Sequence, residues 1–438
     1  MGVKNLLMMQ ANLVAGIFML FAACSPVIPQ QEVEILKEIL FENVDESTDL
    51  LKTLTVIMKF NENNVPDDLL EKRRKLFEKR YYNEEVAVVV GNLRKRFDYI
   101  ALSENLDSYE IDLSERNLAV LPKDIFTGLR NLKKLNLWYN RIDYLESSTF
   151  NNLSNLQRLE LDSNNLTALS SGTFNGLEIL EVLDMSGNKL NCLQPGTFNN
   201  LSNLQRLELD SNNLTALSSN IFNGLDKLED LNLSWNKLNS LQPGTFNNLS
   251  NLKYLRIHKN HLTALLSNTF NGLEKLEVLD LSWNNLNSLQ PGTFNNLSKL
   301  QKLELDNNNL AALLSDTFNG LEKLEVLDLS SNNLESLQPG TFNNLKNLQT
   351  LYIYKNSLTA LSSDMFNALE KLELLYLSSN KLNSLQPGTF NNLSNLKNLY
   401  IRHNNLTSLP KNIFTGLEKL KSLGFCGYKI DKILSKAT

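Results

Sequence analysis

Leucines along most of the chain follow one pattern that repeats every 24 residues. The stretch from Leu156 to Leu166 reads LQRLELDSNNL, which has the form L-x-x-L-x-L-x-x-N-x-L. A column of phenylalanines with the same spacing runs from Phe126 to Phe414. The twelve asparagines that recur at this spacing are Asn140, Asn164, Asn188, Asn212, Asn236, Asn260, Asn284, Asn308, Asn332, Asn356, Asn380 and Asn404.

A repeat of this length predicts a stack of similar units. In Leu159-Glu160-Leu161 the alternation of apolar and polar residues predicts a short strand with both leucines inward and Glu160 outward. One such repeat cannot enclose a core, so neighbours must stack and bury a continuous leucine column. We expect each asparagine amide to donate to, and accept from, backbone groups left unpaired where the strand ends. The phenylalanines, half a repeat away, should widen the opposite side and curve the stack.

This pattern is similar to the 24-residue typical class of the leucine-rich repeat family. The resemblance covers roughly three-quarters of the chain, from about Ile111 to Ile433. It implies an α/β solenoid, a leucine-rich repeat horseshoe with a parallel β-sheet on its concave face, in a domain of about 13–14 repeats over residues 105–435. A small helical segment over residues 25–104 is expected to precede the repeats and cap the open end of the stack.

Stacking turns each outward strand position into a column of side chains from successive repeats. The first outward column changes from acidic residues such as Glu160 to tyrosines near its end. Exposed Trp and Tyr in numbers are typical of protein-binding surfaces, whereas a purely structural strand face needs only small polar residues. The alternative is that these side chains merely keep a scaffold soluble. We predict a ligand-binding patch on the concave face formed by Trp235, Arg256, His258, Trp283, Tyr352, Tyr354, Tyr376, Tyr400 and Arg402.

An internal comparison favours the binding interpretation. The segment from Phe150 to Ser171 is identical to the segment from Phe198 to Ser219, so some repeats have barely diverged. Other copies differ mainly at outward strand positions, and the repeats alternate in two types, which makes 48 residues the apparent duplication unit. The leucine, asparagine and phenylalanine positions are therefore constant, while the outward strand positions vary.

The acidic part of the outward face allows two interpretations. Three strands each carry two acids, which could coordinate Ca²⁺. We favour ion pairs with the neighbouring Arg158, Arg206 and Lys302, and predict neither a metal nor a cofactor. The acids are Glu160 and Asp162, Glu208 and Asp210, and Glu304 and Asp306.

The first 24 residues have the features of an export signal. Lys4 precedes an apolar run from Leu13 to Ala23, which is followed by small residues and Pro26. The end of this run, FAACS, resembles the lipobox of bacterial lipoproteins, in which the cysteine is acylated and becomes the mature N-terminus. Cys24 is therefore the predicted lipidation site, which would attach the chain to a membrane. A plain secretory signal and an uncleaved membrane anchor are the alternatives.

Charge and motif content exclude several classes of function. With 43 Lys+Arg and 48 Asp+Glu, the net charge of −5 gives no positive field for nucleic acid, so no nucleic-acid partner is expected. The cysteines Cys24, Cys192 and Cys426 are too far apart in sequence for a disulfide framework or a zinc cluster. The sequence holds no GxxxxGK, GxSxG or HExxH motif, and we expect no enzymatic activity.

The leading hypothesis is an exported, lipid-anchored bacterial protein whose concave face binds a protein ligand from a host or a neighbouring cell. The absence of the cysteine-rich caps found in metazoan extracellular relatives favours a bacterial source. One alternative is a structural or adhesive spacer in the cell envelope. Another is a secreted effector scaffold that acts in a host cell.

Overall fold

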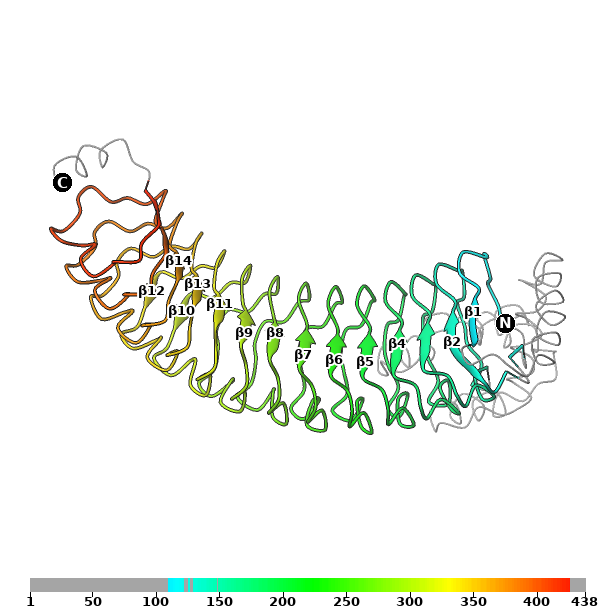
Figure 1. The fold of residues 1–438 in the computed structure, drawn as a ribbon. Coiled ribbons are helices and arrows are strands. Elements are labelled where there is room, and N and C mark those ends of the chain that lie inside the picture. The colour runs from blue at the N-terminus through cyan, green and yellow to red at the C-terminus, as the bar shows by residue number, and fades with distance from the viewer. Residues whose placement is uncertain (1–108, 122–124, 127–128, 148, 426–438) are drawn as a thin grey trace, which may run out of the picture.

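The computed structural model describes residues 109–121, 125–126, 129–147 and 149–425. The predicted signal over residues 1–24, its Cys24 and the predicted helical cap over residues 25–104 lie outside the described residues. Within the described part the chain winds into a curved solenoid in which each repeat makes one turn (Figure 1).

Nearly every repeat contributes one strand to a single parallel sheet. Fourteen strands pair in chain order, and paired residues are 24 apart, as in Leu159 with Leu183. The strands of this sheet are β1 (Tyr109–Asp112), β2 (Leu132–Asn136), β3 (Arg158–Glu160), β4 (Val182–Asp184), β5 (Arg206–Glu208), β6 (Asp230–Asn232), β7 (Tyr254–Arg256), β8 (Val278–Asp280), β9 (Lys302–Glu304), β11 (Val326–Asp328), β13 (Thr350–Tyr352), β14 (Leu374–Tyr376), β15 (Asn398–Tyr400) and β16 (Ser422–Gly424). A separate two-stranded sheet pairs β10 (Ala312–Leu313) with β12 (Ser336–Leu337).

The predicted strand alternation is confirmed. Leu159 and Leu161 are fully buried, and Glu160 between them lies on the outer face. The parallel ladder continues past the short strands, because the Leu161 N–H donates to the Asp184 carbonyl at 2.8 Å and the Ser163 N–H to the Ser186 carbonyl at 2.8 Å. Each repeat is thus hydrogen-bonded to the next while its leucines fill the shared core.

The column asparagines hold the chain where it leaves each strand, as predicted. Asn284 Nδ2 donates to the carbonyls of Ile257, Leu281 and Ser282 at 3.0, 3.1 and 3.2 Å. Its Oδ1 accepts the N–H of Leu262 at 3.0 Å. One buried side chain therefore satisfies four backbone groups in two successive repeats, which explains why asparagine recurs at this position in twelve successive repeats.

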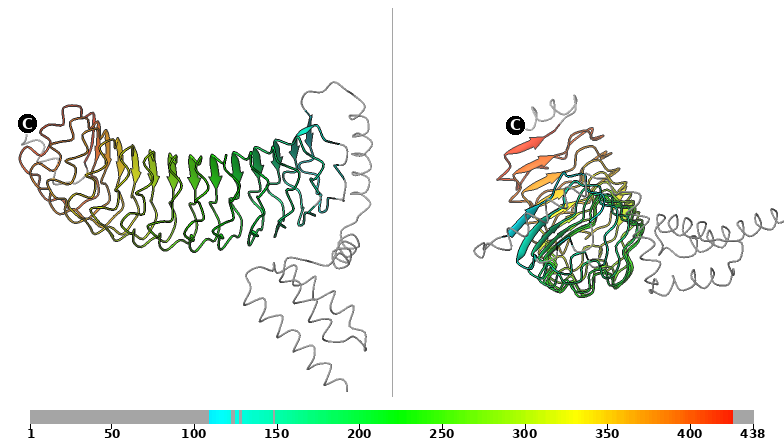
Figure 2. Two further views of the ribbon diagram at one scale, coloured as in Figure 1. Left: turned by 90° about the horizontal axis from the view of Figure 1, so that it is seen from below. Right: turned by 90° about the vertical axis from the view of Figure 1, so that its right-hand side faces the viewer.

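The phenylalanines form a continuous stack on the side opposite the strands. Successive rings from Phe126 to Phe390 lie nearly parallel, with centroids 6.0 to 6.5 Å apart. Strands in a sheet are about 4.8 Å apart, so the phenylalanine side of each repeat is wider than the strand side. This difference curves the solenoid with the strands on its concave face, which Figure 2 shows in its left view. The thirteenth ring, Phe414, contacts Phe425 edge-on instead.

The convex side is built from turns. In the described residues the segments between strands consist of tight turns and extended chain, with no helix among them. The α component of the predicted α/β class therefore has no counterpart in this part of the chain. The repeats are short enough for a turn containing Phe and its neighbours to close each one.

Candidate functional site

The structure places the first outward column in one row along the concave face. Strand pairing aligns Glu160 with Asp184, Arg256 with Asp280, and Tyr352 with Tyr376. The nine residues of the predicted patch all belong to outward positions of this face, but they form two groups rather than one. Trp235, Arg256, His258 and Trp283 lie around β6 to β8, whereas the four tyrosines and Arg402 lie around β13 to β15. Strands β9 and β11, which carry acids, separate the two groups.

The tyrosines around β13 to β15 form a compact aromatic cluster. The rings of Tyr352 and Tyr376 stack with centroids 5.3 Å apart, and those of Tyr376 and Tyr400 with centroids 4.3 Å apart. Tyr354 contacts Tyr352 and Tyr376 edge-on. Burial in this cluster raises the pKa of the Tyr352 and Tyr376 hydroxyls above its usual value, so both remain protonated and can donate hydrogen bonds.

A glycine ends the tyrosine row. Gly424 pairs with Tyr400 in the sheet, and a β-carbon at this position would collide with the Tyr400 ring. The missing side chain therefore lets the ring of Tyr400 lie against the last described strand. Gly424 was not among the predicted site residues, although it breaks a column otherwise filled by aromatic, charged or amide side chains.

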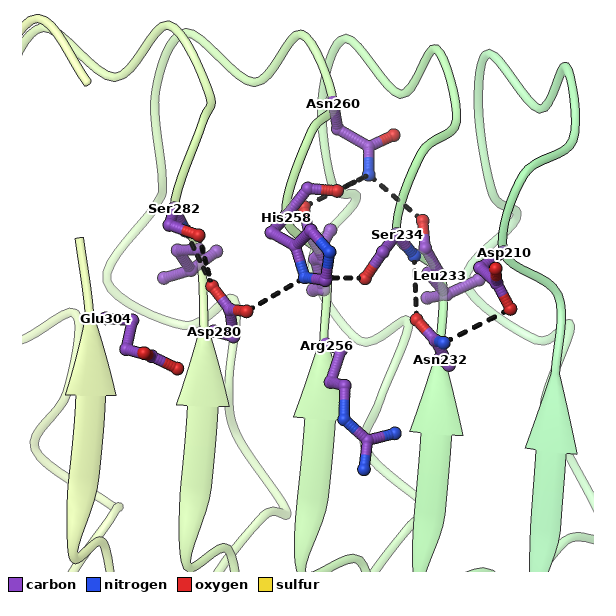
Figure 3. Close-up of polar contacts among 12 residues, drawn as sticks. Asp210, Asn232, Leu233, Ser234, Arg256, His258, Asn260, Asp280, Ser282 and Glu304 are labelled. Atoms are coloured by element: carbon purple, nitrogen blue, oxygen red, sulfur yellow. Dashed lines mark hydrogen bonds and ion pairs between the residues drawn. The ribbon is translucent and has the colours of Figure 1, made fainter. Parts of the chain in front are cut away.

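A hydrogen-bond network orients His258 next to β7 (Figure 3). His258 Nδ1 lies 2.9 Å from Ser234 Oγ and 2.8 Å from Asp280 Oδ2. The Ser282 N–H and hydroxyl both donate to Asp280 Oδ1, at 3.0 and 2.6 Å. Burial opposes the charge of Asp280, but the hydrogen bonds from His258 and Ser282 outweigh it and hold its pKa below the usual value.

This network differs from a catalytic Ser-His-Asp relay. In such a relay the serine and the aspartate contact opposite nitrogens of the imidazole, so that a proton can pass from one side to the other. Here both contacts are made at Nδ1 of His258. The arrangement fixes the ring at the surface and suits recognition.

Arg256 extends away from His258 (Figure 3) and pairs with a carboxylate that sequence analysis missed. Its two guanidinium nitrogens contact the two oxygens of Asp230 at 2.8 and 3.4 Å. Arg206 Nε also approaches Asp230 Oδ2, at 3.4 Å. Asp230 is 7% exposed, so two cations compensate one buried charge. Asp230 follows Arg206 in one column, and Arg256 lies in the adjacent column of the next strand. This arrangement is the signal that a column-by-column comparison could have used.

The predicted ion pairs of the acidic residues are confirmed in two strands of three. Arg158 contacts Glu160 at 2.7 Å and Lys302 contacts Glu304 at 2.9 Å. The predicted pairing of Arg206 with Glu208 is wrong, because Asp230 is the residue paired with Arg206 in the sheet and attracts its guanidinium.

Carboxylates on β3 to β5 repel one another. Burial raises the pKa of Asp162 to about 7, with further contributions from Asp184, Glu160 and Asp210. Burial also raises the pKa of Glu208 and Asp210. Together these five acids, Glu160, Asp162, Asp184, Glu208 and Asp210, form what we call the acidic band. Within the residues that the structure describes, no group of three or more His, Cys, Asp or Glu side chains is arranged to hold a metal ion.

Comparison with known proteins assigns the fold. A family model described as leucine rich repeat matches the chain ten times, in overlapping segments that run from residues 109–166 to residues 375–425. The chain belongs to the leucine-rich repeat family. The predicted family and horseshoe fold are thus confirmed. No curated protein matches the sequence of this leucine-rich repeat chain.

Solved structures of leucine-rich repeat proteins resemble the chain over most of its length. A leucine-rich repeat protein of Leptospira interrogans is 30% identical with a TM-score of 0.64, and the match covers 77% of this chain and 89% of that chain. The TLR13 chain of a TLR13–ssRNA13 complex is 29% identical with a TM-score of 0.65, over 72% of this chain and 51% of that one. A chain of the Drosophila Toll–Spätzle complex is 26% identical with a TM-score of 0.68, over 76% and 45%. The chain thus spans about half the length of the last two.

The described part of the chain contains no helix that is both long enough and apolar enough to cross a membrane.

Proposed function

We propose that this leucine-rich repeat protein is exported and binds a protein ligand through its concave face. The observation that carries the proposal is the tyrosine cluster. Tyr352, Tyr376 and Tyr400 are 24 residues apart in sequence but stack at 5.3 and 4.3 Å on the concave face. Such clustered aromatic side chains with hydroxyl donors are typical of the centres of protein interfaces.

The charge of the concave face favours a protein over a nucleic acid. The TLR13–ssRNA13 complex joins a leucine-rich repeat chain to RNA, and the Toll–Spätzle complex joins one to a protein. In the present chain the acidic band lies on β3 to β5, and further acids such as Glu304 and Asp328 lie on β9 and β11. These carboxylates would repel a phosphate backbone along most of the face.

The proposal is tested by replacing aromatic residues that the fold does not need. We expect the triple variant Trp283→Ala, Tyr354→Ala and Tyr376→Ala to lose ligands that the wild-type chain captures from extracts of host or neighbouring cells. The control variant, Glu274→Ala, Glu322→Ala and Glu370→Ala, removes three exposed side chains outside the outward columns and should capture the same ligands. Captured proteins are compared by quantitative mass spectrometry. Equal capture by all three proteins would favour the spacer hypothesis.

We also propose that Cys24 anchors the exported chain to a membrane. The apolar run before Cys24 and its FAACS ending support this assignment. Metabolic labelling with a palmitate analogue should mark the wild-type protein and leave the Cys24→Ala variant unmarked. A wild-type protein without label would eliminate the lipid anchor and leave the plain secretory signal and the uncleaved membrane anchor as the alternatives.

A further inference from the structure

Two tryptophans distinguish the repeats on either side of β7 from their closest copies. In the alternate repeats, the residue before the column asparagine is Tyr139, Gly187, Trp235, Trp283, Ser331 or Ser379. The surrounding motifs are otherwise alike, for example LDLSWN at residues 279–284 and LDLSSN at residues 327–332. The whole chain has three tryptophans, and two of them flank the single repeat that carries Arg256, His258 and Lys259. Two of the departures from glycine or serine at this position therefore lie on either side of β7.

The two tryptophans enclose the amine of Lys259. Lys259 Nζ lies 3.5 Å from the centroid of the Trp235 ring and 5.4 Å from that of Trp283. The tryptophans themselves are 53% and 54% exposed, so both indoles also face solvent. We call Trp235, Lys259 and Trp283 the Trp–Lys–Trp cluster. Cation–π attraction holds the lysine side chain extended between the rings.

The backbone at this cluster has a conformation that favours glycine. Trp235, Lys259 and Trp283 all have φ of 54°, in the left-handed region, and the equivalent Gly187 has φ of 63°. In this conformation any residue with a β-carbon is disfavoured relative to glycine. Of the other alternate repeats, three place glycine or serine here, and the first places Tyr139. A tryptophan therefore contributes something at this position that the fold does not require.

The charge of Lys259 is uncompensated, unlike that of its neighbours on the same repeat. Arg256 pairs with Asp230, and His258 pairs with Asp280. None of the ion pairs among the described residues includes Lys259. Its amine is flanked by two indoles that displace water, and Coulomb attraction strengthens as the local dielectric falls. A carboxylate brought to this amine would therefore bind more strongly than to an isolated surface lysine.

We propose that the Trp–Lys–Trp cluster binds an acidic side chain of the protein ligand, with the apolar neighbours of that side chain lying on the two indoles. This inference rests on the proposed function, because it names the chemistry of the partner at one part of the concave face. An acidic residue within a chain has a neighbour on each side and can cover both Trp235 and Trp283. A terminal carboxylate could cover only one of them.

The experiment uses the full-length chain with Trp138→Phe, which leaves Trp235 and Trp283 as the two tryptophans, and excites the tryptophans selectively. The probes are the capped tripeptide acetyl-Leu-Glu-Leu-amide and its neutral analogue acetyl-Leu-Gln-Leu-amide. We expect a saturable change of tryptophan fluorescence with the Glu peptide, and an affinity about fivefold higher than for the Gln peptide, as for a partly shielded ion pair. The Lys259→Met variant should bind both peptides equally, because the apolar contacts remain while the charge is lost.

Two further variants control for the general loss of a lysine charge and for a failure to fold. Lys275→Met removes an exposed lysine that bonds Asn251 at 2.7 Å and should retain the preference for the Glu peptide. Thermal unfolding of each variant checks that the fold is intact, and Lys259→Gln replaces Lys259→Met if the latter fails to fold. A preference for Glu that survives the loss of Lys259, or equal binding of both peptides by the Trp138→Phe protein, overturns the inference.

The peptide experiment tests the acidic contact, and the capture experiment tests the proposed function, so the two can fail separately. If the triple variant with Trp283→Ala, Tyr354→Ala and Tyr376→Ala loses its ligands but the peptides show no preference, the concave face binds protein and the acidic contact is wrong. If the peptides discriminate while capture is unchanged by the triple variant, the cluster recognises carboxylates and the proposed protein-binding function fails.

Discussion

At the scale of single residues, the column asparagines show how one side chain type fits one position. Asn284 satisfies three carbonyls and one N–H, all in buried surroundings. Aspartate cannot donate to the carbonyls, and serine cannot reach all four groups. The sequence made this role predictable because the same residue recurs at every 24th position, and the amide chemistry then allowed few partners other than backbone.

Replacing one column asparagine should therefore cost far more than an ordinary polar substitution. We expect Asn284→Ala to lower the free energy of unfolding by about 3 kcal/mol, since several buried backbone groups lose their partners at about 1–3 kcal/mol each. Denaturant unfolding followed by circular dichroism measures the change. The neighbouring Asn285 is exposed, and Asn285→Ala should alter the unfolding midpoint little. Similar midpoints for the two variants would contradict the role assigned to the column.

Residue identity alone did not predict the ion pairs. Arg158 and Arg206 occupy equivalent places in two identical segments, yet Arg158 contacts Glu160 within its own repeat and Arg206 contacts Asp230 in the next one. The difference arises because Val182 follows Arg158 in its column, whereas Asp230 follows Arg206. A surface arginine takes the nearest carboxylate, which depends on the neighbouring repeat.

At the scale of elements, the strands were the most predictable part of the molecule. The alternation in Leu159-Glu160-Leu161 determines which side chains are buried, and the constant 24-residue spacing determines the register of the strands, except at Tyr109, which pairs with Leu132. The structure of the convex segments was harder to predict, because a turn and a short helix can both bury one phenylalanine per repeat. The sequences of these segments are too short to show whether they have the 3.6-residue periodicity of a helix.

The division of the predicted patch into two groups also arises at the level of elements. The sequence shows that Trp283 and Tyr352 face the same side, but two strands with outward acids, β9 and β11, lie between them. The Trp–Lys–Trp cluster was missed as a unit because its contacts join three repeats. Its members lie 24 residues apart, and only the geometry shows that the Lys259 amine reaches both rings.

At the scale of the whole molecule, the acidic band is a property of the assembled stack. Asp162 has a pKa of about 7 because burial is combined with the charges of Asp184, of Glu160 in its own repeat, and of Asp210. In the unfolded chain the group is solvated and Asp184 and Asp210 are far away, so the pKa of Asp162 returns to its ordinary value of 3.8. Between these two pKa values, folding therefore makes the Asp162 carboxyl group take up a proton.

Stability should accordingly fall as the pH rises from about 4 to about 7. Within this window the folded state binds more protons than the unfolded state, so the free energy of unfolding decreases with pH, and it levels off once Asp162 is ionised in both states. Urea midpoints measured across the window should show this decline in the wild type and a shallower one in Asp162→Asn. Asp226→Asn, which changes an exposed acid outside the acidic band, should keep the wild-type slope. A wild-type midpoint that rises steadily with pH would be inconsistent with the raised pKa.

The near-identity of alternate repeats has a consequence for how such a protein changes over generations. Phe150 to Ser171 and Phe198 to Ser219 are the same 22 residues, set 48 positions apart. Unequal recombination between the two coding segments would delete or insert a pair of repeats. The reading frame would be kept, and every leucine, asparagine and phenylalanine of the pattern would stay in place. The gene can therefore produce variants with more or fewer repeats that all keep the core pattern. The length of the concave face can then change without a misfolded variant along the way.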